Sequence, residues 1–199
     1  ASEAADLGLR LGALQVGDLV VEDLGRLELV RPLADTLTHG QDGAGLDVLV
    51  VRKDRGERVE RAVQVKADVV AADLKESSLR EILNYGHTFA HAIEQRENYT
   101  WRHGDAVAVG CLFAAELARA AGVLDDASVA RQRAVVTALG LPTTYSGGDF
   151  DEMLTVMGRD KKTRGNLLRF VVLHAIGDTH RLEGPSRDEL RAAFDAVTA

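Results

Sequence analysis

Helix start and stop signals recur from residue 57 to the end of the chain, and they constrain the fold more than any other feature. Residues 78–81 and 186–189 both have the Ser-x-x-Glu spacing of a capping box, in which the two side chains satisfy backbone amides at a helix start. Gly122 and Gly140 each follow a helix-like segment and are typical of helix ends. These signals predict a mainly α-helical domain.

The expected elements are six helices and one small β-hairpin. The helices are expected at about 57–72, 78–97, 104–121, 126–140, 150–157 and from 186 onward, and the strands at 167–174 and 179–182. Residues 1–59 show no comparable periodicity. We therefore expect a poorly defined N-terminal segment over 1–59 and one multi-helical domain over 60–199.

Charge and cysteine content exclude several classes of protein. The formal net charge of −7 argues against a general nucleic-acid binder. Cys111 is the only cysteine, which rules out an internal disulfide and favours a reducing, cytoplasmic compartment. Apolar runs are far shorter than the roughly 20 residues of a membrane-spanning helix, so no membrane association is expected. The chain starts at Ala1, which leaves open a fragment or a processed product.

Four polar side chains are spaced to share one face of the second expected helix. Arg80, Asn84, His87 and His91 fall within roughly 60° of one another if that helix is continuous, at about 100° per residue. An ordinary surface helix carries solvated lysine and glutamate opposite its core face. A stripe of arginine, asparagine and histidine beside the apolar face indicates a cleft.

Histidine spacing suggests a metal site in this cleft. His87 and His91 are one helical turn apart, and His103 follows at a loop or helix start. Zinc-type ions bind imidazole nitrogen well, and catalytic sites commonly use three protein ligands. The alternative is a set of unrelated surface or capping histidines.

Other charged residues near this segment have less specific patterns. Glu76 lies about one turn before Arg80 and is expected either to orient the site or to act as a favourable charge at a helix N-terminus. Lys66 either reaches the same cleft or extends along the surface. Lys161 and Lys162 form a basic cluster that suits phosphate, or simply a solvated turn.

Taken together, these motifs resemble the C-terminal half of 3-dehydroquinate synthase, of the sugar phosphate cyclase superfamily. The segments that carry the resemblance are KADVV from Lys66, ESSLREILNYGHTFAHAIE from Glu76, HGDAVAVG from His103, and RDKKTRG with LLRFVV after Arg159. Their order and spacing match over about residues 60–199, as a helical metal- and substrate-binding domain.

The resemblance implies a role for each candidate residue. His87 and His103 would be ligands of a divalent metal, zinc or cobalt. The phosphorylated substrate would be held at its phosphate by His91, Asn84 and one of Lys161 or Lys162, and at its carboxylate by Lys66 and Arg80. Glu76 would lie beside the reacting hydroxyl and the metal, so that the catalytic set would be Glu76, His91, Lys66 and Arg80.

The implied reaction is the NAD- and metal-dependent conversion of 3-deoxy-D-arabino-heptulosonate 7-phosphate into 3-dehydroquinate and phosphate. The resemblance thus implies a phosphate-eliminating lyase of the shikimate pathway and of aromatic amino acid biosynthesis. A homodimer is also implied by the resemblance. A metal would polarise the substrate oxygen, while cations clamp both anionic ends of the substrate through several steps.

The resemblance does not extend to residues 1–59, and we expect this segment not to match the family. The family's third metal ligand, a glutamate in Glu-x-x-Lys, and its glycine-rich NAD domain are not found there. We therefore expect a partial synthase whose N-terminal segment is truncated, divergent or misread through a frameshift, and which lacks synthase activity alone. The alternatives are a related sugar-phosphate cyclase, a metal-dependent polyol or alcohol dehydrogenase, and a non-catalytic helical module.

Overall fold

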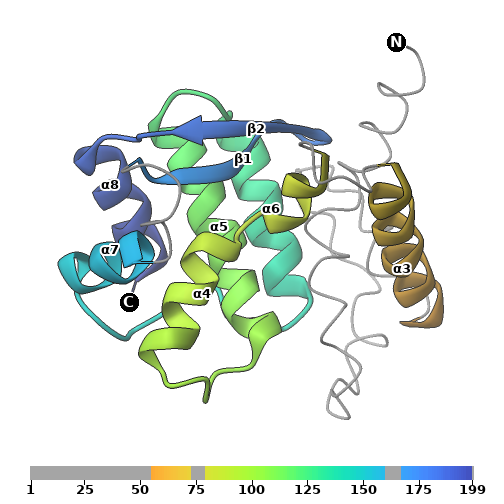
Figure 1. Ribbon diagram of the computed structural model, residues 1–199, viewed down its shortest axis with the longest axis horizontal. Helices are drawn as coiled ribbons and strands as arrows, with labels where there is room; N and C mark the ends of the chain where they lie inside the picture. Colours follow the sequence, from red (N-terminus) through yellow and green to blue (C-terminus); the bar gives the residue numbers. More distant parts are fainter. Residues whose placement is uncertain (1–54, 73–78, 160–166, 199) are drawn as a thin grey trace, which may run out of the picture.

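Helix α5 (His103–Ala120) lies at the centre of the structure, a computed structural model that describes residues 55–72, 79–159 and 167–198 (Figure 1). All residues from 106 to 118 are buried. The sequence dictates this position, because a helix that is apolar nearly all round is stable only when other elements cover every side of it. Helices α4, α6 and α8 and strand β1 all pack against α5.

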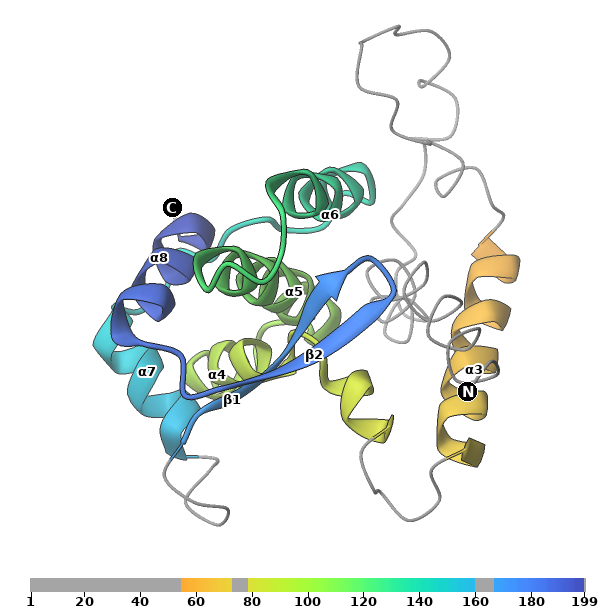
Figure 2. The same ribbon diagram turned by 90° about the horizontal axis from the view of Figure 1, so that it is seen from above.

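The remaining elements follow one another along the chain with short connections. Their bounds are α3 Arg55–Ala72, the 3-10 helix η3 Leu79–Asn84, α4 His87–Arg96, α6 Asp126–Ala138, α7 Phe150–Arg159, β1 Arg169–Ala175, β2 Asp178–Glu183 and α8 Arg187–Val197. Helix α7 packs against α4, and the hairpin crosses one end of the bundle (Figures 1 and 2). Helix α3 stands to one side and contacts η3 (Figure 2).

Local signals in the sequence account for several helix ends. The Asp125 side chain accepts a hydrogen bond from the Ser128 amide at the start of α6. Ser186 and Glu189 form the expected capping box of α8, with both reciprocal hydrogen bonds present. Gly122 follows α5 with a φ of 70°, a left-handed conformation that glycine adopts without steric cost. The predictions for Gly122 and for the Ser186–Glu189 capping box are confirmed.

The hairpin pairs β1 and β2 in antiparallel register, from Arg169 opposite Glu183 to Ala175 opposite Asp178. Residues 170–173 of β1 are buried in succession, because this strand also packs against α5 and η3. Strand β2 is mostly exposed. The expected hairpin is therefore confirmed, and the fold is mainly α-helical with one small antiparallel sheet, as predicted.

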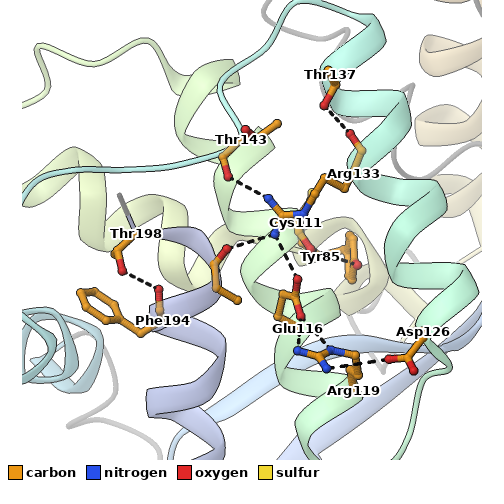
Figure 3. A network of polar contacts seen from close by, with 11 residues as sticks. Tyr85, Cys111, Glu116, Arg119, Asp126, Arg133, Thr137, Thr143, Phe194 and Thr198 are labelled. Carbon is orange, nitrogen blue, oxygen red and sulfur yellow. Dashed lines mark hydrogen bonds and ion pairs between the residues drawn. The ribbon is translucent and has the colours of Figure 1, made fainter.

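A buried carboxylate joins three helices on the side of α5 that faces α6 (Figure 3). Glu116 of α5 accepts hydrogen bonds from Arg133 of α6 at 3.0 Å and from Arg119 at 2.8 Å. Arg133 also donates to the backbone oxygen of Ala196 at 3.1 Å. The network fixes how α6 and the end of α8 lie against the central helix.

Within the described residues, no helix combines the length and apolarity needed to span a membrane. The division of the chain into 1–59 and 60–199 stays a prediction, because residues 1–54 lie outside the described part of the chain.

Candidate active site

Helix α4 begins at His87, after a break that the sequence pattern did not predict. One continuous helix was expected from Ser78 to about residue 97, but η3 ends at Asn84 and Gly86 has a φ of 78°. A 3-10 helix has three residues per turn, and a left-handed residue turns the chain away from the helix axis. The expected single stripe of Arg80, Asn84, His87 and His91 is therefore wrong: only the two histidines share a helix.

Close packing against α5 explains the break. A Cβ on Gly86 would lie 2.6 Å from the backbone nitrogen of Cys111, and a Cβ on Gly110 would overlap the carbonyl oxygen of Gly86. The two backbones approach this closely only because both residues are glycine. Next to this contact, the buried Tyr85 hydroxyl donates to Gln132 Oε1 at 2.6 Å. These contacts fix the start of α4, and with it His87, on the central helix.

Three imidazole rings meet between the start of α4 and the start of α5. The ring centroids of His87 and His91 are 5.5 Å apart, those of His87 and His103 are 5.4 Å apart, and those of His91 and His103 are 6.2 Å apart. His87 and His103 are partly buried, whereas His91 is exposed. The structure thus brings together all three histidines that the spacing selected.

Two of the three rings are held through Nδ1. His87 Nδ1 lies 3.1 Å from the backbone oxygen of Tyr85, and His103 Nδ1 lies 2.9 Å from Glu94 Oε1. A carbonyl or carboxylate oxygen accepts, so each Nδ1 carries the hydrogen and Nε2 is the nitrogen available to a metal. Burial lowers the pKa of His87, which favours the neutral imidazole that metals bind.

A polar network orders the turn that carries the chain from α4 to His103. The Tyr145 hydroxyl donates to Glu97 Oε1 at 2.5 Å, and Arg96 donates to the same carboxylate oxygen at 2.8 Å. The Trp101 ring packs edge-on against the Tyr145 ring, with centroids 5.2 Å apart. Because the turn is held at both ends, the position of His103 relative to α4 is defined.

A cavity of about 600 Å³ opens beside the histidines. His91 and His103 line it together with Glu94, and Val156 and Met157 of α7 form its apolar side. A cavity with a few polar groups on an apolar wall suits a small-molecule ligand. Tyr99 at its edge is 75% exposed and adopts a left-handed backbone conformation with a φ of 59°.

The other predicted site residues lie on η3, on α3 or outside the described part of the chain. Asn84 is exposed at the end of η3, and Lys66 is exposed on α3 rather than lining the cavity beside the histidines. Arg80 belongs to η3. The remaining predicted residues, Glu76, Lys161 and Lys162, lie outside the described part of the chain.

Two of the three histidine rings have the chemistry that a divalent metal requires of its ligands. Both rings expected to bind it, His87 and His103, present Nε2 and hold Nδ1 by a hydrogen bond, the arrangement usual for metal-binding histidine. Among residues 55–72, 79–159 and 167–198, no three His, Cys, Asp or Glu side chains form a complete metal-binding group. Burial raises the pKa of the Cys111 thiol to about 12, so it is not a thiolate ligand near neutral pH.

Glu94 is the site residue that the sequence reasoning missed. It follows His87 by seven residues and His91 by three, so all three residues lie on one face of α4. The signal was present in this spacing. The spacing places Glu94 on the histidine face, but its contact with His103 forms only because the chain reverses between α4 and α5.

Comparisons with known proteins match most of this chain to one family. The family model described as "3-dehydroquinate synthase C-terminal" matches residues 42–163. A 3-dehydroquinate synthase from Nocardia farcinica (strain IFM 10152) is 62% identical over 196 residues, covering 93% of this chain and 52% of the relative. One from Corynebacterium jeikeium (strain K411) is 62% identical over 140 residues, covering 70% of this chain and 38% of the relative. Similarity to the family thus extends upstream of residue 60.

Solved structures show the same fold at low sequence identity. A 2-epi-5-epi-valiolone synthase from Streptomyces hygroscopicus subsp. jinggangensis 5008, with NAD+ and Zn2+ bound, has a TM-score of 0.66 at 22% identity, covering 95% of this chain and 51% of that one. A 2-deoxy-scyllo-inosose synthase complexed with carbaglucose-6-phosphate, NAD+ and Co2+ has a TM-score of 0.60 at 20% identity. The match covers 91% of this chain and 51% of that one.

The match between the family model and this chain includes the helices that carry all three histidines, since α4 and the start of α5 lie within residues 42–163. The chain spans about half or less of the length of these relatives, 38% of the Corynebacterium jeikeium protein and 52% of the Nocardia farcinica protein. By the extent of the model match, the chain belongs to the 3-dehydroquinate synthase family.

Proposed function

We propose that this chain supplies the metal- and substrate-binding part of a 3-dehydroquinate synthase, which converts 3-deoxy-D-arabino-heptulosonate 7-phosphate into 3-dehydroquinate and phosphate. The observation that carries the proposal is the meeting of His87, His91 and His103 beside a cavity, with centroids 5.4–6.2 Å apart. The relatives named 3-dehydroquinate synthase, at 62% identity, support the choice of reaction.

In this proposal His87 and His103 hold a zinc or cobalt ion through Nε2. When bound, the metal would supply Lewis-acid polarisation of a substrate oxygen, and NAD would supply reversible oxidation. The chain's own contribution is positional, because Tyr85 and Glu94 hold the two rings in one tautomer each. His87 is partly buried against α5, which limits its movement between successive chemical steps.

The remaining residues would bind the two anionic ends of the substrate. His91 is exposed one helical turn from His87, so it reaches a ligand that lies beside the metal. We assign the substrate phosphate to His91, Asn84 and one of Lys161 or Lys162, and the carboxylate to Lys66 and Arg80. Glu76 is assigned to the reacting hydroxyl. The charged donors among them, Lys66 and Arg80 and the lysine at 161 or 162, bind carboxylate and phosphate strongly.

Binding measurements on the purified chain test this function. The chain is titrated with Co²⁺ or Zn²⁺, then with NAD and the heptulosonate phosphate, and metal content and heat of binding are recorded. We expect metal binding and saturable binding of the phosphorylated keto acid. Binding of neither would contradict the proposal and favour a non-catalytic helical module.

Two further ligands separate the related enzyme classes. A phosphorylated sugar without a carboxylate would bind as well as the heptulosonate phosphate if the chain belonged to another sugar-phosphate cyclase. Simple alcohols would compete if it belonged to a polyol or alcohol dehydrogenase. We expect neither, because the assigned cations at both ends favour a substrate with two anionic groups.

Turnover is a separate question, and phosphate release with NAD and metal present measures it. We expect none from the 199-residue chain alone, as the sequence predicted. Release of phosphate at a measurable rate would overturn that expectation. The expected homodimer and cytoplasmic location stay predictions.

A further inference from the structure

One face of α4 carries three polar side chains that all point toward the start of α5. His87, His91 and Glu94 are spaced by four and three residues, which places them within about 60° around the helix axis. His103 is the first residue of α5 and lies opposite this face. In the described part of the chain, Glu94 is thus the carboxylate that directly contacts a ring of the histidine cluster.

The contact is close and partly shielded from water. Glu94 Oε1 lies 2.9 Å from His103 Nδ1, and the Glu94 side chain is only 12% exposed. A carboxylate with so little access to water loses hydration, and the hydrogen bond from the imidazole compensates for part of that loss. The His103 ring is 41% exposed, so its other edge remains open toward the cavity.

We infer that Glu94 is a positioning residue that holds His103 with its hydrogen on Nδ1 and thereby sets the affinity of this chain for a divalent metal. The inference rests on the proposed function, in which His103 binds the metal through Nε2. The carboxylate orients the ring and makes Nε2 a stronger electron donor. Without it, the neutral ring can carry its hydrogen on Nε2, which blocks metal binding at that nitrogen.

Two other roles for Glu94 lead to different results. An ion pair at the surface contributes little, and losing it would leave metal binding unchanged. A direct metal ligand would require a negatively charged oxygen at the ion, so glutamine would be as damaging as alanine. A positioning carboxylate predicts a third pattern, because the amide oxygen of glutamine still accepts a hydrogen bond from Nδ1.

The first measurement needs no metal. Long-range ¹H–¹⁵N correlation spectra of the metal-free chain, recorded at about pH 8 where imidazole is mostly neutral, report which nitrogen of each histidine carries the hydrogen. We expect the Nδ1–H form for His103 in the wild-type chain and in E94Q. In E94A we expect a mixture of both forms, while His87, which is held by the Tyr85 carbonyl, keeps its Nδ1–H form.

The second measurement is the affinity for Co²⁺ and Zn²⁺, by competition with a chelator. We expect E94A to bind about 10- to 100-fold more weakly than the wild-type chain, the range seen when such outer carboxylates are removed. The loss of metal affinity in E94Q is expected to be several-fold smaller than in E94A. The matched control is Q95A, since Gln95 lines the same cavity next to Glu94. It should bind metal as the wild type does.

The outcomes separate this inference from the function on which it rests. If the wild-type chain binds no metal, the proposed function fails, and the spectra alone decide the role of Glu94. If the wild-type chain binds metal and E94A binds it equally well, the inference fails. Equal losses in E94Q and E94A would instead make Glu94 a ligand and also overturn it. Thermal unfolding checks that E94A folds, and E94Q serves as the test if it does not.

Discussion

Gly86 and Gly110 are in backbone contact where the start of α4 crosses α5, and neither position has room for a Cβ. The contact occurs directly before His87 and in the middle of the buried run of α5. It determines how closely the two helices approach and, because His103 starts α5, how His87 lies relative to His103. Backbone packing directly before His87 thus controls the geometry of the histidine cluster.

Gly110→Ala tests this relationship. The added methyl group would overlap the Gly86 carbonyl oxygen, so α4 must shift. We expect a loss of about 1–3 kcal/mol in the free energy of unfolding, typical of an overpacked core, measured by urea denaturation. Gly158→Ala is the control, because a Cβ there meets nothing within 4 Å. That control should be neutral or stabilising by up to about 1 kcal/mol, since alanine favours helix. Equal effects at both positions would contradict the role of the contact.

Glu116→Gln is expected to destabilise the fold by about 1–3 kcal/mol, the usual cost of leaving a buried polar group without its partner. Glu116 is 7% exposed and joins Arg119 and Arg133, so its loss weakens the attachment of α6 to α5. Urea denaturation measures the change. Asp126→Asn is the control, because Asp126 is largely exposed and its pair with Arg119 is loose at 3.8 Å. A change of less than about 0.5 kcal/mol is expected there.

His87→Ala is expected to lower metal content more than His91→Ala does. His87 is partly buried and presents Nε2 because Tyr85 holds its Nδ1, whereas the exposed His91 is assigned to phosphate. Metal content after dialysis against Co²⁺ or Zn²⁺ provides the measurement. His180→Ala, on exposed strand β2, is the control for nonspecific binding by histidine. Equal losses at positions 87 and 91 would remove the basis for assigning His91 to phosphate.

The buried thiol of Cys111 is expected to make the folded chain less stable at high pH. Burial raises its pKa from 9.0 to about 12 in the folded chain. Between those values the unfolded chain releases the proton and the folded chain keeps it, so stability falls as pH rises. In the wild-type chain this difference lowers the free energy of unfolding by up to about 1.4 kcal/mol per pH unit. We expect Cys111→Ala to lack this decrease. Unfolding free energies of both proteins at about pH 8 and pH 10.5 test it. Parallel pH dependences would contradict the raised pKa.

The elements with local start and stop signals could be predicted from the sequence. Asp125, Gly122 and the Ser186–Glu189 box act through hydrogen bonds or backbone angles within a few residues, so they operate in any context. The prediction of one continuous helix from Ser78 was wrong for the opposite reason. Its periodicity continues through Tyr85 and Gly86, and only contact with α5 makes the chain turn there.

The residues of the candidate site also differ in whether local spacing or tertiary contacts determine them. The spacing of His87 and His91 on one helix needed only the geometry of an α-helix, and it held. The inclusion of Arg80 and Asn84 in the same stripe depended on a continuous helix and was wrong. Glu94 was missed, because its partner His103 is nine residues away and reaches it only after the chain reverses between α4 and α5.

By itself, then, the sequence determined which segments are helical, where most of them end, and which histidines are candidates for a metal. Those properties follow from interactions over three or four residues. Only the tertiary structure decided that the chain breaks at Gly86, that His103 joins His87 and His91, and that Glu94 holds the His103 ring. These depend on two helices meeting at a glycine contact and on a carboxylate that is shielded by packing, neither of which is encoded in local spacing.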